Sequence, residues 1–376
     1  MILQKGVYYI GHLGIEPAFR GQGAGTALIN YFIDDAIKSI SSWKTYEPTP
    51  LIRLNKLNNE LKFNEIYYKD EDKRFELKSF KALGGAFAVY KIASEKKNIT
   101  VSTATAGNHG RSVAWGAQRL GLKCKIFISE FVSESRAEAM RNLDAEVIRV
   151  KGNYDNSLKE CIEQSNKNNW EIVQDVSWEG YKEVPKLIMA GYTIMVKEII
   201  DEINKNSITH VFLQAGVGGM AAAMIAGFAK LSENIPQFII IEPENADCVF
   251  QSIKNNKPTT VDIKKETVMG GMSCGDVSSI AWEILKNSTN CCLTVPDDAI
   301  STTIAMLAKK HLSDEKIIAG ECAVPGVIAL IGSFNNKEYL DKLELNEQSN
   351  VLLFGCEGLT DNAMYQKLLS DGLQKI

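Results

Sequence analysis

The feature that most constrains this chain is the alternation of short apolar runs with longer helix-like runs from about residue 45 onward. Runs typical of strands are EIYYKDE (65–71), KCKIFIS (123–129), EVIRV (146–150), HVFLQAG (210–216), FIIIEPE (238–244) and NVLLFGCEG (350–358). Helix-like runs lie between them at 110–122, 132–145 and 184–203, whereas KNSTNCC (286–292) and SDEKII (313–318) look like surface loops. This order predicts an α/β architecture with mainly parallel sheets, in which ligands bind beyond the carboxyl ends of the strands.

The length of 376 residues exceeds what one simple core usually supports, so we expect two lobes. The net charge of −4 gives no sign of a nucleic-acid or acidic-membrane partner, since either would favour a basic domain. The sequence has no apolar run of about 18 residues and no secretory signal, so we expect neither a membrane span nor secretion. Eight scattered cysteines without a CxxC pair indicate reduced thiols in a cytoplasmic protein, and four dispersed histidines predict no metal site.

The stretch LKSFKALGGAF (77–87) sets one lysine, Lys81, among residues that look buried. A buried lysine tends to lose its charge, and the neutral amine is then a nucleophile that reacts with carbonyl groups. The alternative is a lysine at a helix start whose stem packs on apolar neighbours while its head reaches water.

A second stretch, QAGVGGMAAAM (214–224), follows an apolar strand and opens a helix-like run. Its residues Gly216, Val217, Gly218, Gly219 and Met220 can turn tightly and direct backbone N–H groups at an anion, which the helix dipole also stabilises. No lysine follows, so this is not a nucleoside-triphosphate loop. A phosphate cradle is the preferred interpretation, and a glycine-rich turn chosen for close packing is the alternative.

The third stretch, STATAGNHGRS (102–112), leads small hydroxyl residues into a helix. Successive N–H groups of Thr105, Ala106, Gly107 and His109 would be able to bind a substrate carboxylate, and Asn108 a ring hydroxyl. Alone, the stretch is equally compatible with an ordinary capped helix start.

In this order the three stretches resemble the fold-type II pyridoxal-phosphate enzymes, the tryptophan synthase β-like family, which also includes threonine dehydratase. Eight blocks resemble diaminopropionate ammonia-lyases within that family, from about residue 46 to 361: YEPTPL, KDEDKRF, SFKALGGAFAV, GNHGRSVAWGAQRLG, VQDVSWEGY, LQAGVGGMA, EPENADC and MGGMSCG. The resemblance implies two lobes, each with a central, mostly parallel sheet flanked by helices. It further implies a homodimer that uses pyridoxal 5'-phosphate to eliminate ammonia from 2,3-diaminopropionate, which yields pyruvate.

The resemblance also implies roles for single residues. Lys81 would bind the cofactor covalently and then act as a base at Cα, while Asn108 would contact the cofactor ring. The 216–220 glycine loop would bind the cofactor phosphate, and Cys356 would face the pyridine nitrogen, unless it is only a small buried residue at a strand end. Asp175, in VQDVSWEGY, would receive the substrate amino group or assist the leaving amine; the alternative is an aspartate that caps a loop.

Three features depart from the family pattern or leave alternatives open. Ala106 replaces an aspartate suited to proton abstraction from the D-isomer, so we expect preference for the L-isomer. In GECAVPG (320–326), Cys322 and Pro325 stand where the family tends to have smaller residues. Cys248 and Cys274 match two family cysteines, and we expect free thiols rather than a regulatory disulfide.

The N-terminal stretch LGIEPAFRGQGAGTALINYFI (13–33) does not fit the lyase pattern and resembles the pyrophosphate-binding segment of GNAT acetyltransferases. There, Arg20, Gly21, Gly23 and Gly25 would surround the anion of coenzyme A. About 45 residues cannot build a whole acetyltransferase, so we interpret the segment as a fragment that packs on the lyase body or on a second subunit.

The predicted organisation is therefore an appendage at 1–44, a large cofactor-binding lobe at 45–87 and 191–376, and a small lobe at 88–190. The rival functions are L-serine or L-threonine dehydratase and a pyridoxal-phosphate-binding regulatory protein without turnover. A coenzyme A binding module is the weakest alternative.

Overall fold

The computed structural model describes residues 13–14, 24–203 and 207–376. The chain divides into two compact units. Unit 1 comprises Met1–Leu28, Pro48–Lys73 and Met195–Ile376, and unit 2 comprises Ile29–Glu47 and Arg74–Ile194.

Within its described residues, unit 1 holds a seven-stranded sheet. The strand order is β1 (Leu13–Gly14), β10 (Cys291–Val295), β9 (Gln237–Pro243), β8 (His210–Gln214), β11 (Asn350–Gly355), β3 (Glu65–Asp70) and β2 (Leu51–Arg53). The five interior strands run parallel, while β1 and β2 pair antiparallel at the two edges. Strands β8 and β10 are buried along their whole length, as expected of parallel strands covered on both faces.

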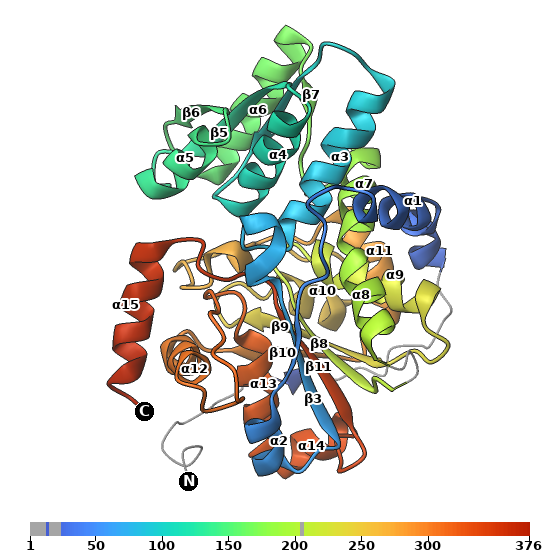
Figure 1. Cartoon of the computed structure of the whole chain (residues 1–376), viewed down its shortest axis with the longest axis vertical. Coiled ribbons are helices and arrows are strands. Elements are labelled where there is room, and N and C mark those ends of the chain that lie inside the picture. Colours follow the sequence, from blue (N-terminus) through green and yellow to red (C-terminus); the bar gives the residue numbers. More distant parts are fainter. Residues whose placement is uncertain (1–12, 15–23, 204–206) are drawn as a thin grey trace. The chain divides into compact units, whose positions relative to one another are not determined.

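Helices cover both faces of this sheet, with α9 and α11 on one side and α12 and α13 on the other (Figure 1). The helices of unit 1 are α2 (Asn55–Leu61), α8 (Ile194–Glu202), α9 (Gly219–Leu231), α10 (Cys248–Asn255), α11 (Ser279–Ser288), α12 (Asp298–Ala308), α13 (Pro325–Phe334), α14 (Lys337–Lys342) and α15 (Asn362–Leu373), with a 3₁₀ turn at Gly270–Met272. Proline at the first position of α13 suits a helix start, because that N–H would have no helical partner.

Unit 2, all of whose residues are described, contains a four-stranded parallel sheet in the order β6 (Glu146–Val150), β5 (Lys123–Ser129), β4 (Thr100–Ala104) and β7 (Glu171–Ile172). Its helices are α3 (Lys81–Glu95), α4 (Asn108–Arg119), α5 (Glu134–Arg141), α6 (Tyr154–Asn168) and α7 (Glu183–Tyr192). Helix α1 (Ala24–Ser41) and the 3₁₀ segment Glu71–Glu76 continue from unit 1 into unit 2.

Alternating side chains of β5 contact different layers of unit 2. Phe127 packs with Cys161 of α6, whereas Ile126 lies against Gly110 of α4. The small hydroxyls and glycines of the 102–112 stretch thus belong to a strand and a helix that are held tightly against this sheet.

The end of α1 and the residues that follow it are anchored within unit 2. Ile29, Ile33, Ala36 and Ile40 are fully buried, and their spacing of three and four residues gives one helix face. The next aromatic residue, Trp43, contacts the rings of Phe75, Tyr90 and Trp115, and the Arg119 guanidinium stacks over the rings of Trp43 and Trp115.

The observed elements agree with most of the sequence-based expectations. All six predicted strand runs contain strands, but KNSTNCC is not a surface loop, because Cys291 and Cys292 begin the buried strand β10. The single helix expected at 184–203 is two, α7 and α8, which break at Thr193, where the hydroxyl donates to the Ala190 carbonyl oxygen at 2.6 Å. The boundaries predicted for the two lobes stay a prediction. The compact units differ from them in that residues 74–87 belong to unit 2, because α3 packs on α4 and α7.

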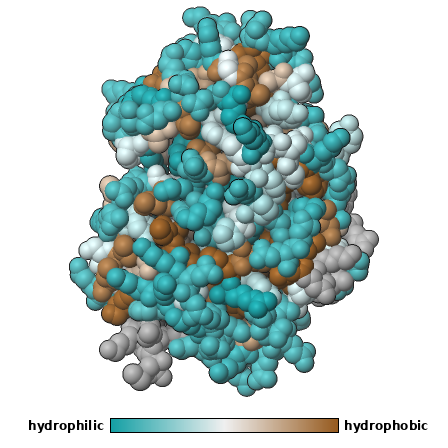
Figure 2. Space-filling model, viewed as in Figure 1, coloured by the Kyte–Doolittle hydropathy of each residue, from teal (hydrophilic) through white to brown (hydrophobic). Residues whose placement is uncertain are grey.

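None of the helices in the described residues combines the length and the apolar character needed to cross a bilayer. Figure 2 shows mainly hydrophilic residues on the visible face, with hydrophobic ones in small groups.

Candidate functional site

Lys81 is the first residue of α3, and its backbone is fixed from two directions. Its N–H donates to the Ser79 hydroxyl oxygen at 3.3 Å, and the Ser112 hydroxyl of α4 donates to its carbonyl oxygen at 2.6 Å. A Cβ on Gly85 would lie 2.3 Å from the same Ser112 hydroxyl oxygen, so glycine is what allows α3 and α4 to approach this closely.

The Lys81 side chain lies beside aromatic rings and points at a carboxylate. Its Nζ is 5.3 Å from the ring centre of Phe80, 5.8 Å from that of Tyr192 and 2.5 Å from Oδ2 of Asp175. The side chain is 25% exposed, so it is partly buried but still accessible to a small molecule. The pairing with Asp175 joins residues 94 positions apart, and no local pattern in the sequence predicts it.

His109 completes this group in unit 2. Its Nε2 is 2.7 Å from the Val173 carbonyl oxygen, and its Nδ1 is 3.7 Å from Oδ2 of Asp175. Burial, and secondarily the Lys81 charge, lower the pKa of His109 despite the attraction of Asp175. Burial would raise the pKa of Asp175, but the charges of His109 and Lys81 and the Lys81 hydrogen bond lower it well below its ordinary value. With the imidazole neutral, the lysine dominates this lowering, so Asp175 is ionised.

The loop before α4 is stabilised by hydrogen bonds to the hydroxyl group of Thr105. Thr105 Oγ1 accepts from the N–H groups of Gly107 and Gly110 at 2.9 and 3.2 Å. The Ala106 carbonyl oxygen accepts from Arg136 Nη1 at 3.2 Å, and Asn108 begins α4. The predicted substrate-binding residues therefore lie together at one helix N-terminus, which is a favourable place for a carboxylate.

The glycine loop lies in unit 1, between β8 and the N-terminus of α9. Gly218 has φ +88°, a conformation that side chains disfavour, and a Cβ there would lie 2.7 Å from Leu285. A Cβ on Gly216 would meet Cys274 Sγ at 3.0 Å and the Gly271 carbonyl oxygen at 3.1 Å. The backbone therefore favours glycine here, and the loop leads into the N-terminus of α9, where the first N–H groups of a helix suit an anion such as phosphate.

Two thiols lie beside this loop without forming a disulfide. The Cys248 thiol donates to the Gly216 carbonyl oxygen at 3.6 Å, and Cys274 is the residue that a Gly216 side chain would meet. Neither cysteine is in a disulfide, in agreement with the expectation of thiols.

Cys356 directly follows β11, at the carboxyl end of the unit 1 sheet. It is buried, and its Sγ–H donates to the Cys322 carbonyl oxygen at 3.2 Å, an oxygen that also accepts from Gln214 Nε2. A thiol is a weak hydrogen-bonding group, as the predicted partner of a pyridine nitrogen should be.

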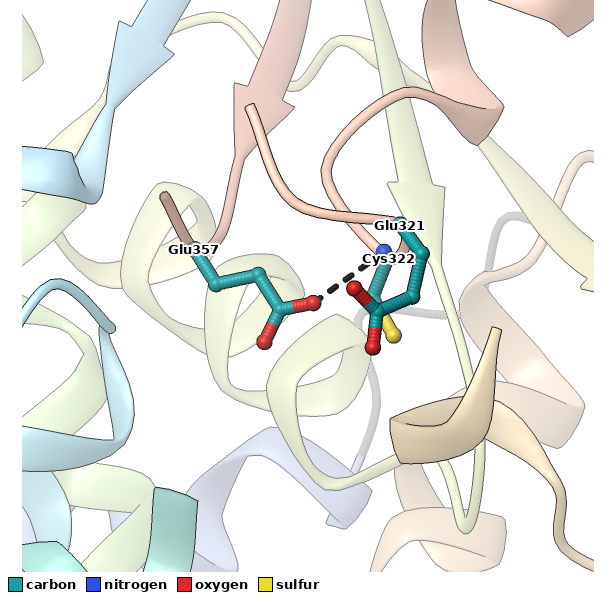
Figure 3. Close-up of side chains that lie close together, drawn as sticks. All are labelled: Glu321, Cys322 and Glu357. Carbon is teal, nitrogen blue, oxygen red and sulfur yellow. Dashed lines mark hydrogen bonds between the residues drawn. The ribbon is translucent and has the colours of Figure 1, made fainter. Parts of the chain in front are cut away.

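Sequence reasoning missed a buried cluster next to Cys356. Figure 3 shows the carboxylates of Glu321 and Glu357 converging on Cys322, whose backbone N–H donates to Glu357 Oε1 at 3.1 Å. Burial and the two carboxylates raise the pKa of the Cys322 thiol well above its ordinary value. A metal ion would have to displace that proton, because the thiolate is the ligand form.

Taken by unit, the structure brings together Lys81, His109 and Asp175 in unit 2, and the 216–220 loop and Cys356 at strand ends in unit 1. Each group has a chemistry of its own. A partly buried amine suits an aldehyde, a glycine loop at a helix N-terminus suits a phosphate, and a buried thiol suits a ring nitrogen that is left unprotonated.

Comparisons with known proteins agree with this chemistry. The family described as "Pyridoxal-phosphate dependent enzyme" matches residues 43–357, and the GNAT acetyltransferase family matches residues 2–54. Diaminopropionate ammonia-lyase of Escherichia coli (strain K12) is 34% identical over 351 residues, 87% of this chain and 88% of that protein. The Salmonella typhimurium enzyme of that name is 33% identical over 385 residues, 94% and 95% of the two chains.

A solved structure of the Escherichia coli lyase, in complex with an aminoacrylate–PLP azomethine reaction intermediate, is 32% identical with a TM-score of 0.87. It covers 97% of this chain and 99% of its own. This chain belongs to the diaminopropionate ammonia-lyase family.

The protein is therefore a pyridoxal-phosphate dependent ammonia-lyase of fold type II, which confirms the resemblance, the fold class and the cofactor predicted from sequence. The ammonia-lyase also carries the predicted GNAT-like N-terminal segment. Of the residues expected there to bind an anion, Arg20, Gly21 and Gly23 lie outside the described residues, and Gly25 lies in α1.

Proposed function

We propose that the enzyme eliminates ammonia from 2,3-diaminopropionate, with preference for the L-isomer, and that the enamine product hydrolyses to pyruvate and a second ammonia. The observation that carries this proposal is the Lys81–Asp175 contact of 2.5 Å, which pairs an amine with a carboxylate inside one compact unit. Identity of 33–34% to ammonia-lyases of this name over most of the chain supports the choice of substrate.

Bound pyridoxal phosphate would supply an electron sink that makes the substrate Cα–H acidic. The chain's own groups would bind and orient it: Lys81 by a covalent bond, residues 216–220 through backbone N–H groups, Asn108 at the ring and Cys356 at the ring nitrogen. The N-terminus of α4, with Thr105, Ala106, Gly107 and His109, would bind the substrate carboxylate.

Lys81 and Asp175 would divide the proton transfers. Once the substrate has displaced it, the Lys81 amine would remove the Cα proton from one face. Asp175, ionised and adjacent, would orient the substrate β-amino group and stabilise it as it leaves in protonated form. The 2.5 Å contact places the two groups side by side, so both would be able to act on one bound substrate.

The stereochemical preference rests on Ala106. An alanine methyl group cannot remove a proton, and the proposed base Lys81 attacks from a single face. The D-isomer presents its Cα–H on the opposite face, so it should react more slowly.

The test is keto-acid formation from L- and D-diaminopropionate, L-serine and L-threonine by the purified holoenzyme. We expect the highest kcat/KM for L-diaminopropionate, and loss of turnover in Lys81→Ala. Faster D-isomer turnover would overturn the stereochemical preference. Faster turnover of serine or threonine would assign a dehydratase, and no turnover despite bound cofactor would favour a regulatory protein.

The family resemblance also leads us to propose a cytoplasmic homodimer that takes a small amino acid and no nucleic acid. In the proposed organisation the large lobe, 45–87 with 191–376, holds the cofactor, and the small lobe, 88–190, carries the Asn108 loop.

A further inference from the structure

His109 presents a bare ring nitrogen beside Asp175, and the fold determines which nitrogen this is. The side chain is 5% exposed, and Nε2 lies 2.7 Å from the Val173 carbonyl oxygen. Because a carbonyl oxygen only accepts hydrogen bonds, Nε2 carries the hydrogen. In the neutral ring Nδ1 is therefore an acceptor, and among the described residues it has no hydrogen-bond partner.

Two further observations indicate that this ring is neutral. The carboxylate oxygen Asp175 Oδ2 is 3.7 Å from Nδ1, which is longer than a hydrogen bond from a charged imidazolium would be. Burial, and secondarily the Lys81 charge, lower the pKa of His109, although Asp175 opposes them. A buried acceptor without a donor is unfavourable, so this position favours a ligand that carries N–H groups.

The surroundings of this nitrogen suit a cation. Lys81 Nζ lies 2.5 Å from Asp175 Oδ2. The same Nζ lies over two aromatic rings, with the ring centres of Phe80 and Tyr192 at 5.3 and 5.8 Å. A carboxylate and two aromatic ring faces all attract an ammonium group. The lysine ammonium pairs with the carboxylate but leaves His109 Nδ1 without a donor from the described residues.

We propose that His109 Nδ1 and Asp175 Oδ2 together form a subsite for the ammonium group on Cβ of the substrate, and that this pair distinguishes 2,3-diaminopropionate from L-serine. This inference deepens the proposed function and rests on it. An ammonium group donates up to three hydrogen bonds, so it serves both acceptors at once. A nitrogen beside the pair can lie about 2.9 Å from each of two acceptors that are 3.7 Å apart.

A hydroxyl group on Cβ cannot serve the pair in this way. It has a single hydrogen to donate, so L-serine or L-threonine satisfies one acceptor and leaves the other buried without a donor. It also carries no positive charge for the carboxylate and the two rings. The penalty for one unpaired buried acceptor corresponds to a factor of about 10 to 100 in affinity. The pair therefore selects an amino group over a hydroxyl group of similar size.

The first experiment measures binding rather than turnover. Lys81→Ala lacks the proposed base, and it is saturated with pyridoxal phosphate and titrated calorimetrically with L-2,3-diaminopropionate, L-serine and L-alanine. The pH is about 8.5, where an imidazole with an ordinary pKa is neutral. His109→Gln in the same background keeps an N–H for Val173 but has no acceptor at the Nδ1 position. We expect its affinity for diaminopropionate to fall about 10- to 100-fold, and its affinities for serine and alanine not to fall.

His210→Gln is the matched control variant and should bind all three amino acids as its parent does. His210 is also buried, with Nε2 2.9 Å from the Leu343 carbonyl oxygen, but its Nδ1 already has a partner, Thr209 Oγ1, at 2.7 Å. Equal losses for alanine and diaminopropionate in His109→Gln would show a purely structural role.

Two other outcomes separate the subsite from the lyase activity. A parent that binds diaminopropionate no more tightly than serine would overturn the subsite, whatever the keto-acid assay shows. Selective binding that depends on His109, without keto-acid formation by the unaltered enzyme, would support the subsite and refute the lyase activity.

The second experiment does not need His109→Gln to fold. Imidazole nitrogen resonances of Lys81→Ala with bound cofactor are followed by NMR as each amino acid is added. The chain has four histidines, so replacing the other three by glutamine one at a time assigns the signal of His109. We expect the Nδ1 resonance to move when diaminopropionate is added and to stay in place with alanine. An Nδ1 that is already protonated before ligand is added, or that does not respond to diaminopropionate, would overturn the proposal.

Discussion

At the scale of single residues, burial and neighbouring charges decide which carboxyl groups of this enzyme are ionised. Asp175 is held ionised by a lysine that lies 94 positions earlier in the sequence. Asp70, at the end of β3, is instead a buried carboxyl whose pKa is raised to about 6, chiefly by burial, with further contributions from Asp72 and Glu71. Two aspartates of one chain thus have opposite shifts, and their consequences can be separated experimentally.

Asp70→Asn should stabilise the enzyme at alkaline pH. A carboxyl whose folded pKa is raised contributes stability below its unfolded pKa and loses it as the pH rises through about 6. Asparagine does not titrate and keeps an oxygen to accept the Asp72 N–H. Urea unfolding at pH 5 and pH 8 should show that the free energy of unfolding of the variant, relative to the parent, is about 1.4 kcal/mol more favourable at pH 8, because about one pH unit separates pH 5 from the folded pKa.

The exposed Asp341→Asn serves as the control for that measurement. An Asp70→Asn chain with equal relative stability at both pH values would contradict the raised pKa.

Ala106→Asp should restore a base on the face opposite Lys81. General-base catalysis contributes factors of about 10² to 10⁴, so we expect kcat/KM for D-diaminopropionate to rise about tenfold or more. Ala106→Asn, which has the same shape but no basic group, is the matched control. An equal gain in both variants would mean that shape, rather than proton abstraction, limits the D-isomer.

Sequence could locate the individual residues but not their pairings. Lys81, Asn108 and the 216–220 loop lie within recognisable local patterns. The contacts of Asp175 with Lys81 and His109, and the convergence of Glu321 and Glu357 on Cys322, join segments that no local pattern relates. The pKa shifts follow from those contacts, so they too required the fold.

At the scale of elements, glycine sets how closely the helices of unit 2 approach the one that carries Lys81. A Cβ on Gly84 of α3 would lie 2.5 Å from the Ile188 carbonyl oxygen of α7, and one on Gly191 would lie 2.8 Å from Gly84 Cα. On the other side, Gly116 of α4 faces Ala86 equally closely. The first two turns of α3 therefore pack closely against α7 on one side and α4 on the other.

Gly84→Ala should lower the free energy of unfolding by about 1 to 3 kcal/mol, because the extra methyl group has no space. Gly326→Ala is the matched control: it also lies in a buried helix, α13, but its Cβ would make ordinary contacts of 3.6 Å. That variant should stay within about 1 kcal/mol of the parent. Urea unfolding compares the two, and similar losses in both would contradict the role of close packing.

Elements with strong apolar periodicity were predictable, and the exceptions have physical reasons. The strands at 65–70, 123–129 and 146–150 agree with prediction to within a residue. Strand β10 was missed because its first residues follow a polar KNSTN run, and burial by neighbouring strands is a tertiary effect. The break at Thr193 was hidden because apolar residues continue on both sides of it.

At the scale of the whole molecule, the chain passes from unit 1 to unit 2 and back twice, since residues 29–47 and 74–194 of unit 2 are each flanked in sequence by segments of unit 1. Neither unit is a continuous segment, so cutting the chain at one loop cannot separate them. This explains why a length-based argument predicted two lobes but could not fix their boundaries.

The proposed homodimer is tested by light scattering of the purified enzyme. A dimer gives about twice the chain mass of 41.6 kDa over a wide range of concentration. Ala106→Asp should behave identically, since residue 106 belongs to the substrate loop in the proposed function. A mass equal to a single chain at all concentrations would refute the dimer.

The short pairing of Leu13 and Gly14 with β10 gives the acetyltransferase-like segment a use that does not involve coenzyme A. An open parallel sheet exposes unpaired N–H and C=O groups at its border, which invites other chains to add strands there. By covering part of that border, the N-terminal segment would protect the enzyme from self-association. Shortened forms that begin after residue 23 should therefore aggregate sooner, even while their catalytic groups remain intact.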